Sequence, residues 1–268
     1  MKAILIAAGR GKRLGANTDE LPKTLVPVGE RSILGWQLRA LATAGVDEVV
    51  IIRGYRGDVL EAGARATAPA GMSLRFVDNH AWPTNNVLLS LACARAELDG
   101  PTLVSYSDII FTPAVAIAAA AGAGPIDLVI DADFRAIYEG RTEHPLDEGE
   151  VADLDASGRV RRVGKRALPP AEAYGEFIGL ARFDAVGSAA AGALLDELAD
   201  RYRATPDQPF QRAARYQNAY LTDLLQELID RGLAINPVTI HGQWREIDTS
   251  QDLARAVALV QSASREWS

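Results

Sequence analysis

The chain has few residues that form crosslinks or bind soft metal ions. Cys93 is the one cysteine among its 268 residues, which excludes an internal disulfide and a zinc site built from thiolates. The sequence also lacks an apolar run of about 18 residues, the length that a membrane-spanning helix needs. Its first residues have the pattern of a buried strand rather than of a signal peptide. We therefore expect a cytoplasmic protein with no membrane partner.

Basic residues are also fewer than acidic ones. Lysine and arginine number 28 against 35 aspartates and glutamates, a formal net charge of −7. An acidic chain is a poor partner for nucleic acid. The basic residues near the N-terminus are therefore a local patch, which suits a small anionic substrate. The length is sufficient for one large α/β domain with a sizeable core.

The first twenty-five residues carry the strongest pattern. Residues 3–8 are a continuous apolar run, typical of a strand that is buried on both faces of a parallel sheet. Gly9 and Gly11 follow directly, and glycine permits positive φ and a close approach of backbone N–H groups to phosphate oxygens. The stretch also contains four cations, which are Arg10, Lys12, Arg13 and Lys23. This combination predicts a triphosphate site.

Two common phosphate loops are excluded. Leu14 stands where a dinucleotide fingerprint requires glycine, and Arg13 follows Gly11-Lys12 where a kinase-type loop requires serine or threonine. The simplest alternative is a tight turn with a solvated basic rim.

Strand and helix patterns alternate along the chain. We predict helices over 32–44, 57–66, 113–124, 187–203 and 216–231, and strands over 48–52, 73–77, 102–106, 127–133, 160–164, 174–181 and 234–238. This rhythm predicts an α/β fold, a single Rossmann-like domain over 1–268 with a mixed, mostly parallel central sheet flanked by helices. Ligands should lie beyond the carboxyl ends of the strands. Residues 1–125 would mainly bind nucleotide and 126–268 mainly the second substrate.

Asn85, Asn86 and Ser90 precede or begin a helix and allow two interpretations. Thr84 or Asn85 could cap that helix. Alternatively, the amides could contact the edge of a pyrimidine base, since an amide presents both a donor and an acceptor. The sequence leaves both open.

Three carboxylates have the spacing of a metal site. Asp108 follows the strand over 102–106, and Glu246 and Asp248 lie two residues apart, so that an extended chain turns both to one side. Carboxylate oxygens are the protein ligands that Mg²⁺ takes beside phosphates and water. Helix capping is the alternative for Asp108 and Asp248, although Thr249 or Ser250 is better placed to cap the last helix.

The polar run over 138–145, which contains a glycine and a proline, reads as a loop over the end of the sheet. Arg135 and Arg141 could form forked contacts with a phosphonate or lie on the surface. We expect His144 to be structural or to support a neighbouring ligand. The sequence does not decide whether Asp131 and Asp133 touch substrate, nor whether 205–220 forms a lid or a subunit contact in a homodimer.

These motifs together resemble the sugar-phosphate nucleotidyltransferases. The glycine loop matches their Leu/Ile-Ala-Ala-Gly-x-Gly-x-Arg-Leu followed by Pro-Lys. Asn-Asn-x-x-x-Ser-Leu and Trp-x-Glu-Ile-Asp-Thr resemble phosphocholine-type cytidylyltransferases. Gly-Arg-Thr-Glu-His-Pro, with two glutamates following, is more similar to the phosphonate cytidylyltransferases.

The resemblance implies transfer of CMP from CTP to a small phosphonate, such as phosphonoformate, 2-aminoethylphosphonate or a hydroxyalkylphosphonate, with release of pyrophosphate and Mg²⁺ as cofactor. In that family Arg13 would hold the β- and γ-phosphates and Lys23 the α-phosphate, while Lys165 and Glu176 face the acceptor. The implied nucleotide site comprises Ala8, Gly9, Gly11, Lys12, Arg13, Lys23, Asn85, Asn86 and Ser90. The implied acceptor site comprises Arg135, Arg141, Lys165 and Glu176, and the metal site Asp108, Glu246 and Asp248.

Three alternatives remain. A sugar phosphate or phosphocholine could be the acceptor, but phosphocholine usually needs an aromatic cage, and only 6% of the residues are aromatic. A non-catalytic nucleotide-binding regulatory domain could lose its metal carboxylates, and this chain has all three.

Overall fold

The computed structural model describes residues 1–263 and residue 267. Nine strands form the central sheet: β1 (Lys2–Ala7), β4 (Glu48–Arg53), β5 (Ser73–Asp78), β6 (Thr102–Tyr106), β8 (Ile126–Asp131), β9 (Glu150–Leu154), β10 (Val160–Lys165), β11 (Gly175–Phe183) and β12 (Ile235–Ile240). Two short pairs, β2 (Pro27–Val28) with β3 (Arg31–Ser32) and β7 (Ile109–Phe111) with β13 (Trp244–Glu246), lie outside it.

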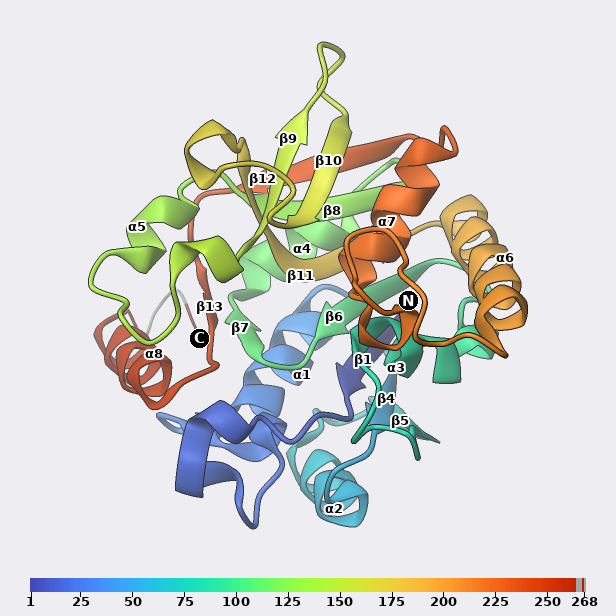
Figure 1. Ribbon diagram of the computed structural model, residues 1–268. Coiled ribbons are helices and arrows are strands. Elements are labelled where there is room, and N and C mark those ends of the chain that lie inside the picture. The colour runs from blue at the N-terminus through green and yellow to red at the C-terminus, as the bar shows by residue number, and fades with distance from the viewer. Residues whose placement is uncertain (264–266, 268) are drawn as a thin grey trace.

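Helices connect these strands (Figure 1). They are α1 (Ile33–Thr43), α2 (Gly57–Thr67), α3 (Val87–Cys93), α4 (Pro113–Ala120), α5 (Phe134–Tyr138), α6 (Ala185–Tyr202), α7 (Leu221–Asp230) and α8 (Ser250–Ser262). Short 3₁₀ turns include η1 (Lys12–Thr18), η2 (Lys23–Leu25) and η6 (Tyr216–Asn218). In the described ranges, no helix combines the length and the apolar character needed to cross a membrane.

The sheet has a parallel core and antiparallel flanks. Strands β5, β4, β1 and β6 lie side by side and parallel. Strand β11 then joins β6 in the antiparallel direction and also pairs with β8 and β9. The predicted mixed α/β sheet is thus confirmed, and the parallel strands place the loops after β1 and β6 at the same edge.

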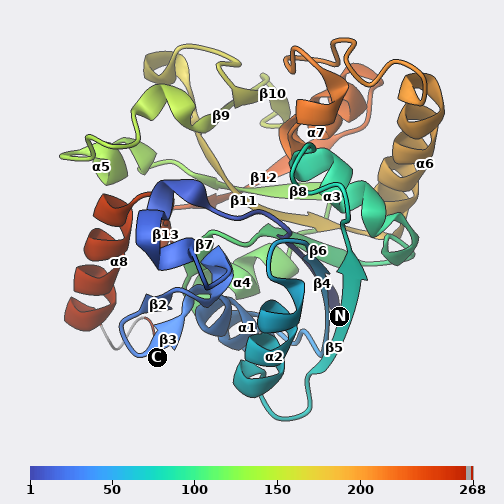
Figure 2. The same cartoon turned by 60° about the horizontal axis from the view of Figure 1, so that its bottom comes forward.

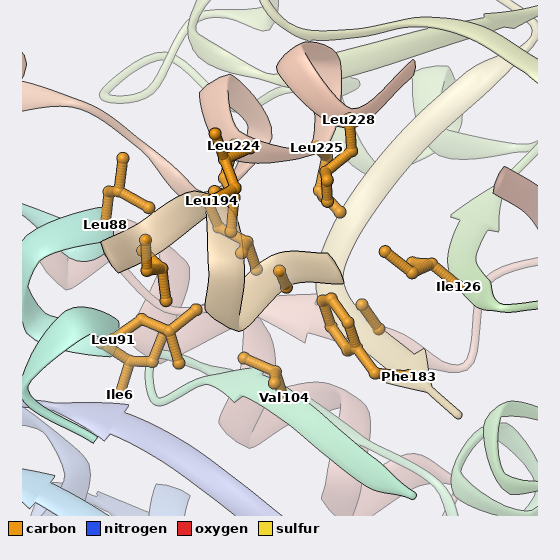
Figure 3. Close-up of a cluster of buried hydrophobic side chains, with 14 of the residues drawn as sticks. Ile6, Leu88, Leu91, Val104, Ile126, Phe183, Leu194, Leu224, Leu225 and Leu228 are labelled. Carbon is orange, nitrogen blue, oxygen red and sulfur yellow. The ribbon is translucent and has the colours of Figure 1, made fainter. Parts of the chain in front are cut away.

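The core lies on both faces of this sheet, because successive side chains of a strand point to opposite faces. On β1, Ile4 and Ile6 join the cluster beneath α3, α6 and α7, whereas Leu5 joins the cluster with α1 and α4. Figure 2 shows these two groups of helices on opposite sides of the sheet. In Figure 3, Ile6 lies next to Leu91 of α3, and Leu88 and Val104 belong to the same cluster, all four buried.

A third cluster attaches the last helix to the N-terminal segment. Ala256 and Val260 of α8 are buried with Val28 and Ile33. This packing brings the chain just before α8 close to the glycine loop, although the two are far apart in sequence.

Several predicted boundaries were wrong. The short helix α5, between the predicted strand over 127–133 and the predicted loop, was not predicted. The predicted helix over 216–231 is a 3₁₀ turn followed by α7, which starts at Leu221, where the Asp223 carboxylate accepts from the backbone N–H of Tyr220. Helix α4 ends at Ala120, ahead of Gly122 and Gly124.

Candidate active site

The loop after β1 is shaped by one close contact. Gly11 has φ 72°, in the left-handed region. A Cβ atom there would lie 2.6 Å from a side-chain carbon of Lys23. Glycine is therefore required for two reasons, the backbone conformation and the lysine stem that passes over it. Ala8 is buried, and Gly9 and Lys12 are exposed on this loop.

Lys23 lies between two carboxylates. Its ammonium is 3.1 Å from Asp108 Oδ2 and is also hydrogen-bonded to Asp248. Burial alone would lower the pKa of Lys23, but Asp108 and Asp248 raise it well above its usual value. Arg13, with an exposed side chain, pairs with the other oxygen of Asp248. Burial would raise the pKa of Asp248, yet the Lys23 ammonium outweighs it and holds the pKa far below its usual range.

A cavity of about 220 Å³ opens beside the glycine loop. Its wall includes Gly9, Gly11 and Lys23, and its far side includes Asn85, Asn86 and Ser90. The structure thus gathers most of the predicted nucleotide residues around one space. Arg13 lines the neighbouring cavity instead, and Lys12 lines neither of the two in the part of the chain that is described.

Asn79 organises the far side of this cavity. It is 1% exposed, donates to Asn85 Oδ1 and Ser90 Oγ, and accepts from Asn85 Nδ2. We did not predict its role, although an asparagine directly after a strand was a usable signal. The N-cap of α3 is Asn86, whose side chain donates to the carbonyl of Asn218 rather than capping the helix. The prediction that Thr84 or Asn85 caps this helix was therefore wrong.

A second cavity of about 210 Å³ adjoins the first. The two share Asp108 and Asp248 in their walls, so these carboxylates stand where two ligands would meet. Acidic residues outnumber basic ones in the second cavity. Its basic lining residues are Arg13 and Lys165, and its acidic ones are Asp108, Glu148, Glu150, Glu176, Glu246 and Asp248. Four aromatic rings also line it, those of Tyr106, Phe177, Tyr220 and Trp244.

Lys165 reaches this cavity from the end of β10. Its ammonium is 3.3 Å from Glu148 Oε2 and 4.7 Å from the centre of the Tyr220 ring. Burial would lower the pKa of Lys165, but Tyr220 and Glu150 raise it. A charged lysine at this position can neutralise an anion in the second cavity.

Glu150 and Glu176 are buried without a salt bridge in the described ranges. Burial raises the pKa of Glu150 to about 7, although Lys165 and the hydroxyls of Tyr106 and Thr222 oppose the shift. Burial raises the pKa of Glu176 to about 8. One Glu176 oxygen accepts from Tyr138, while the other lacks a hydrogen-bond partner among the described residues.

The structure does not bring Arg135 or Arg141 into the second cavity. Arg135 is exposed and donates to the backbone carbonyls of Pro170 and Ala173. Arg141 is buried and bridges Asp252 and Glu246. Both guanidinium groups have partners within the protein, and their contact with the acceptor stays a prediction.

Glu246 and Asp248 face one way, as the alternation predicts, and His144 lies against both. Its Nδ1 is 3.4 Å from Asp248 Oδ2 and 3.6 Å from Glu246 Oε2. Burial raises the pKa of Glu246, and the neighbouring Asp248 raises it further. Thr249 and Asp252 form the capping box of α8, so Asp248 is not used as a cap. Asp108 stands across the Lys23 ammonium from this group.

Asp131 and Asp133 have structural partners. Asp131 is fully buried and accepts from Trp244 Nε1 and from the backbone of Gly242, which fixes the start of β13. Asp133 lies 3.1 Å from His241 at the surface.

The segment 205–220 packs against the rest of the chain. Tyr216 stacks on Tyr202 of α6, with ring centres 4.4 Å apart. The carbonyls of Gln217 and Ala219 accept from Asn86 and Leu88 at the start of α3. The segment therefore packs against the start of α3, and its role as a lid or in a homodimer stays a prediction.

Comparison with known proteins gives consistent matches. The family model of the MobA-like NTP transferase domain matches residues 3–165. CTP:phosphoglutamine cytidylyltransferase of Campylobacter jejuni is 26% identical over 94% of this chain and 98% of that protein. CMP-5'-(3-aminopropyl)phosphonate synthase of Streptomyces rubellomurinus is 35% identical over 59% of this chain, but the match spans 23% of that protein. Choline-phosphate cytidylyltransferase of Streptococcus pneumoniae is 29% identical over 41% of this chain and 46% of that protein.

Solved structures show the same fold. CTP:phosphocholine cytidylyltransferase from Streptococcus pneumoniae superposes with a TM-score of 0.69, covering 97% of this chain and 98% of that one at 19% identity. The inositol-1-phosphate CTP transferase from T. maritima gives a TM-score of 0.71, covering 98% and 96% at 19% identity.

Proposed function

Since the chain belongs to the MobA-like NTP transferase family, we propose that this nucleotidyltransferase transfers CMP from CTP to a small phosphonate that carries an amine, and releases pyrophosphate. The observation that carries the proposal is the pair of adjoining cavities. One is lined by the glycine loop and the other by carboxylates and aromatic rings, and Asp108 and Asp248 stand between them.

Support for CTP comes from the asparagine network. Asn85 and Asn86 line the first cavity opposite the glycine loop, and Asn79 holds Asn85 and Ser90 in place. Amide groups can complement the donor and acceptor edge of a pyrimidine. The two cytidylyltransferases and the CMP-5'-(3-aminopropyl)phosphonate synthase among the relatives agree with this choice.

The basic residues supply the charge that the reaction needs. The acceptor oxygen attacks the α-phosphorus in line, and no covalent intermediate with the protein is required, so that catalysis is positioning and electrostatics. Lys23 and Arg13 now neutralise Asp248. In the complex, Arg13 would turn to the β- and γ-phosphates and Lys23 to the α-phosphate. Lys165 would neutralise the phosphonate as it approaches.

The residues present fit Mg²⁺. Asp108, Glu246 and Asp248 offer the oxygen ligands that this ion takes, and Asp108 Oδ1 is buried without a hydrogen-bond partner in the described part of the chain. When bound, Mg²⁺ would neutralise the triphosphate and polarise its phosphoryl oxygens.

The lining of the second cavity favours an amine on the acceptor. Glu176 and Glu150 have no cationic side chain bound to them among the described residues, and both carry a pKa raised by burial. An ammonium group beside Glu176 would compensate that carboxylate. We therefore favour 2-aminoethylphosphonate or a similar aminoalkylphosphonate over phosphonoformate and hydroxyalkylphosphonates.

Phosphocholine is the second candidate. The low aromatic content argues against a cage for a quaternary ammonium, but the four rings of Tyr106, Phe177, Tyr220 and Trp244 all line the second cavity. Aromatic faces attract quaternary ammonium groups.

A panel of acceptors tests the proposal. The protein is incubated with CTP, Mg²⁺ and each of phosphonoformate, 2-aminoethylphosphonate, 2-hydroxyethylphosphonate, phosphocholine and glucose 1-phosphate, and pyrophosphate release is measured. We expect the highest kcat/KM with the aminoalkylphosphonate. If glucose 1-phosphate or phosphonoformate gave the highest turnover, the acceptor would not be an amine-bearing phosphonate. If no acceptor led to release of pyrophosphate, the proposed activity itself would be wrong.

A further inference from the structure

His144 carries a buried imidazole that makes no hydrogen bond with the described residues. Its side chain is 2% exposed, and neither ring nitrogen has a hydrogen-bond partner in the described part of the chain. Unpaired buried polar atoms are costly and therefore uncommon. The imidazole nearest to Asp248 thus calls for an explanation.

The surroundings of His144 have the dimensions of a metal site. Donor atoms of His144, Glu246 and Asp248 lie within 4.8 Å of one another. The nitrogen-to-oxygen distances are 3.4 Å to Asp248 and 3.6 Å to Glu246. Two ligands bound at about 2.1 Å to one ion are about 3.0 Å apart at a right angle and about 3.4 Å apart at a tetrahedral angle. A small inward movement of each ligand would close this set around one ion.

Neighbouring residues already orient these ligands. Arg141 donates to Glu246 Oε2 at 2.8 Å and forms a second, forked contact with Asp252. Asp252 in turn accepts from the backbone of Asp248 and Thr249. Outer contacts of this kind commonly fix the ligands of metal sites. They also account for the buried arginine that we had assigned to the acceptor.

The local charge balance favours a cation. Four carboxylates, of Asp108, Glu246, Asp248 and Asp252, face three cations, of Arg13, Lys23 and Arg141. The carboxylate oxygens of Glu246 and Asp248 lie within 4.8 Å of each other and of a His144 nitrogen, and two carboxylates at such a distance repel each other unless a cation lies between them. Arg13 pairs with the same Asp248 oxygen that faces His144, but its side chain is 56% exposed and is free to turn away.

We infer that His144, Glu246 and Asp248 form a divalent cation site that binds a first-row transition metal more tightly than Mg²⁺, and that this site is available before CTP binds. The position between Asp108 and Asp248 is held by the Lys23 ammonium, so that it opens only when Lys23 moves. Imidazole nitrogen is a good ligand for transition metals, whereas Mg²⁺ prefers oxygen. The inference goes beyond the proposed function because it concerns the nucleotide-free protein.

Mn²⁺ alone is the probe. The nucleotide-free protein is titrated with Mn²⁺, binding is followed by loss of the aqueous Mn²⁺ electron paramagnetic resonance signal, and pulsed spectroscopy detects ¹⁴N coupling to a bound imidazole. We expect one bound Mn²⁺ with nitrogen coupling that an equal concentration of Mg²⁺ does not displace. His144→Gln should remove the coupling and weaken Mn²⁺ binding by at least about tenfold.

The other two histidines provide matched controls. His80 and His241 are exposed, so that the double variant His80→Gln/His241→Gln should keep both the affinity and the nitrogen coupling. Its spectrum decides the question even if His144→Gln fails to fold, because every imidazole signal then comes from His144. Bound Mn²⁺ without nitrogen coupling in this double variant, coupling that survives in His144→Gln, or absence of Mn²⁺ binding would overturn the inference. The pyrophosphate assay with Mg²⁺ tests the proposed function separately.

Discussion

Lys23 and Asp248 form a buried ion pair although 225 positions separate them in the chain. The pair joins the end of the N-terminal segment to the short stretch between β13 and α8. In this structure the lysine is neutralised by Asp108 and Asp248, the carboxylates that we propose as metal ligands.

Breaking the ion pair should destabilise the protein. Asp248→Asn leaves Lys23 buried with Asp108 as its remaining carboxylate within 4 Å, and we expect the free energy of unfolding to fall by about 3 kcal/mol, measured by urea denaturation with EDTA present. The exposed pair of Arg203 and Asp200 is the control, since Asp200→Asn should leave the urea midpoint unchanged. Equal stability of Asp248→Asn and the parent would show that the pair contributes nothing.

Turnover should depend on both carboxylates at the junction of the cavities. Asp108→Ala and Asp248→Ala should each abolish pyrophosphate release with Mg²⁺ while circular dichroism remains that of a folded protein. A variant that keeps a near-normal kcat removes its residue from the metal site, and one that unfolds shows a structural role.

The asparagine network should control use of the nucleotide. We expect CTP to be preferred over UTP, with ATP and GTP poor. Asn79→Ala should raise the KM for CTP at least about tenfold because Asn85 and Ser90 lose their common partner. Thr84→Ala, which removes an exposed hydroxyl on the same loop, should leave the KM for CTP unchanged. Equal turnover of ATP and CTP would contradict the assignment of the base.

Lys165 should serve the acceptor more than the nucleotide. Two unit charges about 4 Å apart repel by roughly 4 kcal/mol at an effective dielectric constant near 20, so that a phosphonate needs its own cation. Lys165→Ala should lower kcat/KM for the acceptor at least about 100-fold with little change in CTP affinity by calorimetry. Arg166→Ala is the matched control, because Arg166 also contacts Glu148 but has a 77% exposed side chain. Loss of CTP affinity in Lys165→Ala would place this lysine in the nucleotide site.

Glu176 should make stability depend on pH. Its pKa is about 8 in the folded protein against an ordinary 4.5, so that between these values the folded state keeps a proton that the unfolded chain has lost. Stability therefore falls as pH rises from 4.5 to 8. Glu176→Gln should flatten this fall, gaining up to roughly 4 kcal/mol at pH 8 relative to pH 5. Urea denaturation at several pH values measures it, with the exposed Glu30→Gln as control; parallel curves for Glu176→Gln and the parent would refute the burial effect.

Local sequence patterns predicted the parts of the site that follow strands. The glycine loop and Asp108 come directly after buried strands, and parallel strands bring their carboxyl ends to one edge, so that the proximity of Lys23 and Asp108 follows from the fold class. The sequence also predicted that Glu246 and Asp248 face the same way, because side chains two residues apart in an extended chain point to the same side.

Contacts between segments that are far apart in the chain could not be predicted from the sequence. The sequence shows that Arg141 and His144 are near one another but not that α8 brings Asp252 and Asp248 to them. A charged side chain in a loop has the same appearance whether its partner is a substrate or a buried carboxylate. The antiparallel direction of β11 was likewise hidden, because an apolar run does not state which way a strand runs.

Strand β11 also has a mechanical consequence. It pairs with β6 from Leu180 opposite Ser105 to Phe183 opposite Thr102, so that one hydrogen-bonded sheet runs without interruption from the side of the glycine loop to the side of the second cavity. The two sides cannot swing against each other as separate bodies unless these bonds break. Adjustment to the substrates therefore falls to the loops at the edge of the sheet and to side chains such as Arg13, while the sheet holds the two cavities at a constant separation.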